Sequence, residues 1–211
     1  MKILTLLISL IVCQISLGQT VHYDVVKGSK KLGDMTVKRM LSENQVKYEI
    51  ESKVTFRILF SFTVDYESTS EYKYGQLIKE YTHNQLNGST QKKSTIWYDG
   101  EKYTLDLNGS RTTLNNRIIE YSVATIYFEE PRDGQEVFSP QFGEYLEFNK
   151  VGEHQYEMES PDGINLYTYT NGICSEVKVN RDFAKFYFRI TEESLREVQS
   201  KKIVGSSPVV D

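Results

Sequence analysis

Residues 46–74 read VKYEIESKVTFRILFSFTVDYESTSEYKY, and they decide the fold class because apolar and charged side chains alternate along them. The odd positions carry most of the charges, from Lys47 to Lys73. This period of two is typical of a β-strand that buries one face and exposes the other. The apolar and aromatic side chains occupy even positions: Val46, Tyr48, Ile50, Val54, Phe56, Ile58, Phe60, Phe62, Val64, Tyr66, Tyr72 and Tyr74.

A single strand of this length is too long for a compact domain. At the rise of an extended chain, residues 46–74 would span about 95 Å. The chain must therefore turn within the stretch. We expect the corner at residues 57–60, because Leu59 there puts an apolar side chain on the polar side.

Turn signals of one kind punctuate the rest of the chain. Asn-Gly and Asp-Gly pairs tolerate the positive φ angles of tight hairpins, so they mark the places where strands reverse. The pairs are Asn87-Gly88, Asn108-Gly109, Asn171-Gly172, Asp99-Gly100, Asp133-Gly134 and Asp162-Gly163.

The spacing of these turns predicts a mainly β protein. We expect a strongly curved antiparallel meander of roughly 9–11 strands, forming an open or half β-barrel. The clearest hairpins pair 91–98 with 101–107 and 164–170 with 173–179, and further strands fit 21–26, 34–41, 76–84, 144–149 and 154–159.

One segment departs from the strand pattern. Residues 118–130 carry apolar side chains at helical spacing, with Ser122 as a candidate cap and Pro131 directly after the segment, so we predict a short helix there. The same residues also alternate, which leaves a further strand as the alternative. A weaker helical turn follows Thr191, and residues 196–211 are expected to form a flexible tail behind a single domain at 19–195.

Composition excludes several classes of protein. The 211 residues are 39% hydrophobic and 26% charged with a net charge of −4, which argues against a disordered chain and against nucleic acid as the main partner. Two cysteines cannot make a disulfide framework or a four-cysteine zinc site. Cys174 is expected to be a small buried residue on a strand.

The N-terminus has the layout of a secretory signal peptide. Lys2 precedes an almost wholly apolar run, and Ser16 and Gly18 put small residues three before and one before a cleavage site after Gly18. The stretch 1–18 is too short to span a membrane, and the residue before Cys13 argues against a lipid anchor. We therefore expect an exported chain, periplasmic or secreted, with no transmembrane segment after cleavage and a net charge of −5.

Motifs for catalysis or for metal binding are weak. The histidines, His22, His83 and His154, lie far apart in the sequence, and none has metal-ligand spacing. Nucleophile-elbow, phosphate-loop and dinucleotide motifs are not found in the sequence. We therefore predict no catalytic residues, no metal and no cofactor. The carboxylates near residues 49–71 are interpreted as a solvated face that pairs with lysines across strands.

Aromatic side chains give the one candidate binding surface. They suit the concave side of a curved sheet, which they could simply fill. Alternatively, the sheet is wide enough to leave an apolar cavity that the 118–130 segment partly plugs. The residues predicted to line such a cavity are Phe56, Phe60, Phe62, Tyr66, Trp97, Tyr121 and Phe128.

Several segments together resemble an exported family of unknown function from Bacteroidetes-type Gram-negative bacteria. These are Tyr23-Asp24-Val25, residues 31–37, residues 51–56, the corner at 127–131 and residues 161–172. No activity of that family is carried over. More loosely, the expected shape is similar to the open barrel of lipoprotein carriers (LolA/LolB-like), a likeness of fold that does not imply function.

Three functions follow from these observations as alternatives. The first is a non-enzymatic periplasmic protein that binds a hydrophobic or amphipathic, lipid-like molecule on the aromatic face. The second is a structural or interaction protein of the cell envelope with a filled core, which binds a partner protein through a strand edge. The third is a hydrolase with convergent carboxylates or histidines.

Overall fold

The structure, a computed structural model, describes residues 17–57, 60–114, 117–181 and 184–205. Within these residues the chain forms fourteen strands and one α-helix, so the sheet is larger than the 9–11 strands expected. The strands are β1 (Leu17–Lys27), β2 (Lys30–Ser42), β3 (Gln45–Arg57), β4 (Ser61–Lys73), β5 (Gln76–Leu86), β6 (Ser89–Tyr98), β7 (Tyr103–Leu107), β8 (Ser110–Leu114), β9 (Gln135–Ser139), β10 (Glu144–Gly152), β11 (Gln155–Ser160), β12 (Gly163–Thr170), β13 (Ile173–Arg181) and β14 (Ala184–Ile190).

All fourteen strands belong to one antiparallel sheet, and both of its edge strands come from the middle of the sequence. Its order runs from β8 back to β1, crosses to β14 and then runs back to β9. The first and last strands therefore pair with each other, with Tyr23 opposite Ile190. The two edge strands, β8 and β9, are neighbours in sequence, and the sheet is not closed between them. The prediction of a mainly β, open and barrel-like meander is confirmed.

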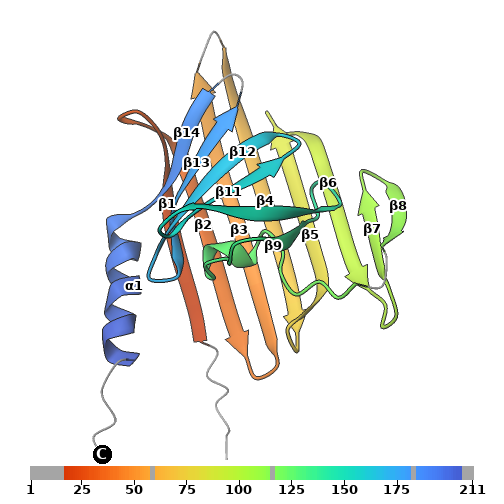
Figure 1. The fold of residues 1–211 in the computed structure, drawn as a ribbon. Coiled ribbons are helices and arrows are strands. Elements are labelled where there is room, and N and C mark those ends of the chain that lie inside the picture. Colours follow the sequence, from red (N-terminus) through yellow and green to blue (C-terminus); the bar gives the residue numbers. More distant parts are fainter. Residues whose placement is uncertain (1–16, 58–59, 115–116, 182–183, 206–211) are drawn as a thin grey trace, which may run out of the picture.

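The sheet curls so that its two halves face each other. Figure 1 shows β9–β12 crossing in front of the long strands β2–β5. The even positions of β3 and β4 point into the space between the halves, and Tyr48, Ile50 and Phe56 are buried there. The period-two prediction holds. Strand β3 ends at Arg57, opposite Ser61 at the start of β4, and residues 58–59 of the corner expected at 57–60 lie outside the described residues.

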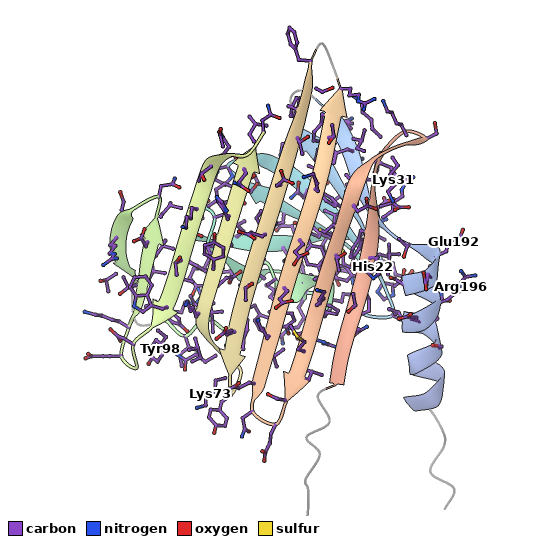
Figure 2. The ribbon with its side chains drawn as sticks, turned by 180° about the vertical axis from the view of Figure 1, so that it is seen from behind. His22, Lys31, Lys73, Tyr98, Glu192 and Arg196 are labelled. Carbon is purple, nitrogen blue, oxygen red and sulfur yellow. The ribbon has the colours of Figure 1, made fainter. Side chains whose placement is uncertain are left out.

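Charged side chains cover the outer face of the first half of the sheet, which Figure 2 shows from behind. Lys53 bridges to Asp65 at 3.1 Å across β3 and β4, and Lys31 bridges to Asp24 at 2.6 Å. These pairs stay in contact with water, so they contribute little stability individually. Their main effect is to keep this face of the sheet solvated.

The predicted hairpins are observed, and the Asn-Gly turns have the expected geometry. Strand β6 pairs with β7 and β12 pairs with β13. At the β5–β6 turn, Asn87 has φ 51° and Gly88 has φ 79°, a conformation that glycine and asparagine adopt at low cost. Strands β8, β9 and β14 were not expected from the sequence. Residues 1–16, which hold most of the predicted signal peptide, lie outside the described residues.

The segment between the two edge strands differs from the prediction. The short helix expected within 118–130 is a single 3-10 turn, η1, at Thr125–Tyr127. Residues before it lie along the edge of β9: the amide of Val123 donates to the carbonyl of Phe138 at 3.1 Å, and the amide of Phe138 donates to the carbonyl of Tyr121 at 2.9 Å. These bonds hold residues 121–123 extended, so a regular helix cannot start at Ser122.

The predicted helical turn after Thr191 is the helix α1 (Glu192–Gly205), which runs beside β1 in Figures 1 and 2. It extends into the segment that was expected to be a flexible tail, while residues 206–211 lie outside the described part of the chain. The amide of His22 donates to Ser194 Oγ at 2.9 Å, and the amide of Thr191 donates to the carbonyl of His22 at 2.8 Å. The helix therefore lies beside β1, next to the end of the β1–β14 pairing where Tyr23 is opposite Ile190.

Candidate functional site

A cavity of about 610 Å³ lies between the two halves of the sheet, and it is partly open to solvent. Strands β2–β5 form one wall and β12–β14 form the other. A smaller space of about 150 Å³ shares part of this wall, including Ile50, Tyr66 and Tyr127, and continues toward β10 and β11. Cavities of this total size are within the range of roughly 300–1,000 Å³ that small-molecule sites occupy.

Most of the cavity wall is apolar because the inner positions of the strands are apolar. Phe186 packs edge-on against Phe56 with ring centroids 5.1 Å apart. The contributing side chains come from both halves of the sheet: Met35, Ile50, Val54, Phe56, Val64, Val177, Val179, Phe186 and Phe188. Such a surface is poorly solvated, so an apolar ligand would gain free energy by covering it.

Polar side chains gather at one part of the wall and are connected to one another. Arg181, the last residue of β13, donates from Nη1 to Asn165 Oδ1 at 3.0 Å and to the carbonyl of Asn180 at 2.8 Å. Asp162, in the β11–β12 turn, accepts from Gln141 Nε2 at 3.3 Å and bridges to Lys92 Nζ at 3.5 Å. Burial lowers the pKa of Arg181, and the nearby charge of Asp162 opposes that change.

Buried tyrosines form part of the cavity wall. Tyr127, at the end of η1, and Tyr167, on β12, both line the cavity, and burial raises the pKa of each phenol well above its ordinary value. Asn165 Nδ2 donates to the Tyr167 hydroxyl at 3.3 Å. These neutral groups offer hydrogen bonds without adding charge.

Two of the seven residues predicted to line a cavity are in its wall, and the other five lie elsewhere. Phe56 and Tyr66 line it, and Phe62 stacks on Phe56 with centroids 5.1 Å apart. Phe128 is buried elsewhere, against Tyr48.

The other three predicted residues do not reach the cavity wall. Phe60 is 84% exposed at the tip of the β3–β4 hairpin, where the alternation of the strands has ended. Trp97 is on the outer face, because Ile96 beside it points inward, and the Arg111 guanidinium lies 5.8 Å from its ring. Tyr121 is on the stretch along β9 and packs against the core from there.

Arg181 was not predicted from the sequence, although a signal exists. Val177, Val179 and Arg181 share one parity on β13, so an arginine continues an apolar run that points inward. Asp162 was noted only as part of a turn. Neither residue type marks a binding site by itself, and only the curl of the sheet brings them together.

A second polar cluster lies inside the other part of the sheet. Glu80 on β5 is fully buried and accepts from Ser68 Oγ at 3.4 Å, while its Oε2 has no hydrogen-bond partner among the described residues. Burial raises the pKa of Glu80 to about 7, and the hydroxyls of Ser122, Ser70 and Ser68 oppose the rise. The Glu80 carboxyl therefore changes its protonation state near neutral pH, well above the pH at which an exposed glutamate does so.

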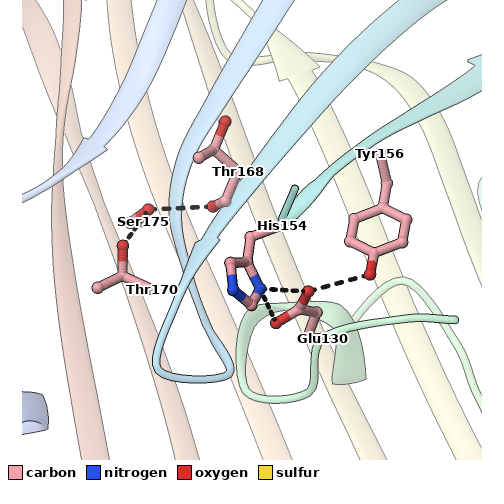
Figure 3. Close-up of polar contacts among 6 residues, drawn as sticks. All are labelled: Glu130, His154, Tyr156, Thr168, Thr170 and Ser175. Atoms are coloured by element: carbon pink, nitrogen blue, oxygen red, sulfur yellow. Dashed lines mark hydrogen bonds and ion pairs between the residues drawn. The ribbon is translucent and has the colours of Figure 1, made fainter. Parts of the chain in front are cut away.

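The histidines do not converge on a catalytic or metal site. His154 Nδ1 lies 2.8 Å from Glu130 Oε1, and the Tyr156 hydroxyl donates to the same oxygen at 3.0 Å (Figure 3). Nearby, Ser175 Oγ donates to the carbonyl of Thr168 at 3.1 Å (Figure 3). His154 is 57% exposed, and the described residues contain no group of three or more histidine, cysteine or acidic side chains placed to hold a metal ion.

Cys174 is buried on β13, as predicted, and burial raises the pKa of its thiol. Its Sγ lies 3.7 Å from the carbonyl of Glu176. A neutral thiol in this position is a poor nucleophile, so Cys174 contributes to packing.

Comparison with known proteins gives a family without an assigned activity. Residues 23–191 match the sequence model of a domain of unknown function, DUF6134. The chain belongs to this family. No curated protein matches the DUF6134 chain. The predicted Bacteroidetes-type origin and the likeness to lipoprotein carriers stay predictions.

The fold of this DUF6134 chain is similar to that of one solved structure. This is the crystal structure of a beta-barrel-like protein of the domain of unknown function DUF1849 from Brucella abortus. The TM-score is 0.50 with 11% sequence identity, over 82% of this chain and 95% of that chain. At this identity the likeness concerns the fold alone. Among the described residues, no helix is long and apolar enough to cross a membrane.

Proposed function

We propose that the chain is a non-enzymatic protein that binds a hydrophobic or amphipathic molecule in the cavity between the two halves of its sheet. The observation that carries the proposal is the cavity of about 610 Å³, lined by apolar side chains from both halves. A core that only fills itself leaves few voids larger than a water molecule. The apolar N-terminal run supports action after export, in the periplasm or outside the cell.

Partner binding through a strand edge has weaker support. Edge strand β8 is short, its side chains from Ser110 to Thr113 are exposed and polar, and Arg111 adds a charge. These features are typical of an edge that resists pairing with another chain. The other edge strand, β9, is bonded to residues 121–123. Among the described residues that line the cavity, Asp162 is the one carboxylate and there is no histidine, so the hydrolase alternative lacks a pair of such groups there.

The proposal is tested with a fluorescent apolar probe, N-phenyl-1-naphthylamine, added to the purified chain. We expect saturable binding in the micromolar range. Val177→Phe adds a ring to the cavity wall and should weaken binding at least 10-fold, because Val177 is buried and lines the cavity. Native mass spectrometry of the chain purified from its own cells would identify a bound molecule.

Lys178→Phe is the matched control. Lys178 is adjacent on the same strand but points to the opposite face, so the same ring is added outside the cavity. Probe binding should stay within about twofold of the wild type. Absence of probe binding to the wild type, or equal losses in both variants, would overturn the proposal.

A further inference from the structure

We infer that the molecule bound in the cavity is an amphiphile with an anionic head group, a carboxylate or a phosphate, which pairs with Arg181. This inference rests on the proposed function and adds the chemical class of the ligand. Its basis is the placement of one half-buried guanidinium at the polar part of an otherwise apolar wall.

Within the described part of the chain, Arg181 has no carboxylate partner. The preceding residue Asn180 and the facing Asn165 supply only neutral oxygens, which both accept from Nη1. None of the ion pairs among the described residues includes Arg181. A guanidinium carries five N–H donors in a planar fork that matches an oxyanion, and bonds from Nη1 leave most of that fork free.

Asp162, the acidic residue of the cavity wall, does not neutralise the site. Its carboxylate is shared between Lys92 and Gln141. Counting described residues only, Arg181, Lys92 and Asp162 carry a net charge of +1 at this part of the wall, whereas the whole chain carries −4. A cationic site in an acidic protein selects for an anion, and partial burial strengthens that selection by removing competing water.

The backbone leaves room for the guanidinium. Gly163, at the start of β12, has φ 116°, and a Cβ there would lie 3.4 Å from Arg181 Nη1 and 3.0 Å from the carbonyl of Asn180. A side chain at this position would therefore crowd the carbonyl of Asn180, which accepts a hydrogen bond from Arg181. The turn before Gly163 carries Pro161 and Asp162, which both line the cavity, so one short turn shapes this part of the wall.

The ligand class follows from the two parts of the wall. An alkyl chain suits the valines and phenylalanines, while an oxyanion suits Arg181 and the amides of Asn165 and Gln141. Free inorganic phosphate would engage only the polar part. We therefore expect it to bind far more weakly than an alkyl phosphate.

The test compares four twelve-carbon compounds, laurate, dodecyl phosphate, dodecanol and dodecylamine, as competitors of N-phenyl-1-naphthylamine below their micelle concentrations. Arg181→Gln should weaken competition by laurate and dodecyl phosphate about 10- to 100-fold, because charge-assisted hydrogen bonds are lost. Competition by dodecanol should change less than about twofold. Inorganic phosphate should not displace the probe.

Asp162→Asn gives an effect of the opposite sign. Removing this carboxylate should strengthen competition by laurate about threefold or more, a gain that misfolding cannot produce. Arg189→Gln is the matched control, since Arg189 pairs with Glu176 at 2.7 Å and is about half exposed. This variant should leave competition by all four compounds as it is in the wild type.

The outcomes separate the two proposals. If the probe binds and dodecanol competes, but Arg181→Gln affects laurate and dodecanol equally, the anionic head group is wrong and the cavity function stands. Stronger competition by dodecylamine than by laurate would also overturn the inference. If the probe does not bind the wild type, the proposed function fails first.

Discussion

Glu80 and Arg181 lie in two parts of the same interior, and the surroundings accommodate their charges differently. Around Glu80, the space between the strands is filled, and seryl hydroxyls surround the carboxyl group. Around Arg181, the space is a cavity, and the guanidinium donates to neutral oxygens of Asn165 and Asn180, while the nearby Asp162 pairs with Lys92. A carboxyl group can bind a proton and become neutral, whereas a guanidinium stays charged at any pH a protein meets.

Under the proposed function, the part around Glu80 is structural and the part around Arg181 binds the ligand. A buried carboxyl that neutralises itself needs no further ligand. A half-buried cation that cannot neutralise itself is stabilised by an anion, and the adjacent empty volume gives space for a molecule that carries one.

The largest expected difference is between two isoleucines. Ile96 lies opposite Glu80 in the filled part and is fully buried, while Ile50 is almost fully buried but borders the cavity. Ile96→Ala should lower the free energy of unfolding by about 4 kcal/mol and Ile50→Ala by about 2 kcal/mol, because the side chain beside a void loses fewer contacts.

Urea unfolding of both variants and the wild type would measure these values. The substitution is the same in each case, so side-chain chemistry is matched and only the surroundings differ. Equal losses of unfolding free energy in the two variants would mean that side chains fill the cavity in solution. The contrast between a filled part around Glu80 and an open part around Arg181 would then be wrong.

The next effect is the pH dependence that Glu80 introduces. Its pKa is about 7 in the folded chain against an ordinary value of 4.5, so the folded state binds the proton more tightly. The stabilisation is complete below pH 4.5 and is lost as the pH rises to about 7, a change of about 3 kcal/mol. Glu80→Gln should remove this loss, so the variant should be more stable than the wild type at pH 8.

Unfolding free energies measured from pH 4.5 to pH 8 would check the prediction. Glu51→Gln serves as the control because Glu51 is exposed on the outer face of β3, and it should keep the pH dependence of the wild type. A Glu80→Gln variant that loses stability over the same pH range as the wild type would contradict the assignment to Glu80.

The sequence predicts the wall of this interior better than it predicts the charges inside it. Alternation along residues 46–74 gives the inward faces of β3 and β4, since the pleat fixes every second side chain to one side. It fails at Phe60 and Tyr74, which are exposed at hairpin turns where the pleat ends. Strand β8 was missed because its side chains are polar on both faces.

Glu80 shows a different reason for failure. Tyr72 pairs with Leu77 while Glu71 pairs with Lys79, so a bulge at Ile78 shifts the parity of β5 and turns Glu80 inward. From sequence alone, Tyr81 is the better candidate for burial. The site at Arg181 is unpredictable for yet another reason, because it depends on how β13 and the β11–β12 turn meet across a curved sheet.

A smaller effect is expected when laurate stabilises the folded chain. This gain in unfolding free energy should depend on Arg181 and not on Glu80. Laurate at 100 times its dissociation constant should raise the unfolding free energy of the wild type by about 2.7 kcal/mol. At the same concentration, Arg181→Gln should lose at least half of that gain. Glu80→Gln should keep it in full, since Glu80 does not line the cavity.

Thermal or urea unfolding with and without laurate would measure these increments. The unliganded stability of each variant is the internal reference, so a general loss of folding does not imitate a loss of binding. A smaller increment in Glu80→Gln than in Arg181→Gln would reverse the roles assigned to the two parts.

The smallest effect is expected at His154, which lies outside both parts of the contrast. Its pair with Glu130 is solvated on the histidine side, and exposed pairs of this kind contribute about 0–1 kcal/mol. His154→Ala should therefore lower the free energy of unfolding by less than about 1 kcal/mol and leave N-phenyl-1-naphthylamine binding unchanged. Fluorescence titration and urea unfolding of the variant check both values. A loss of probe binding would show that the corner at residues 127–131, which carries Tyr127 into the cavity wall, depends on this pair and belongs to the site.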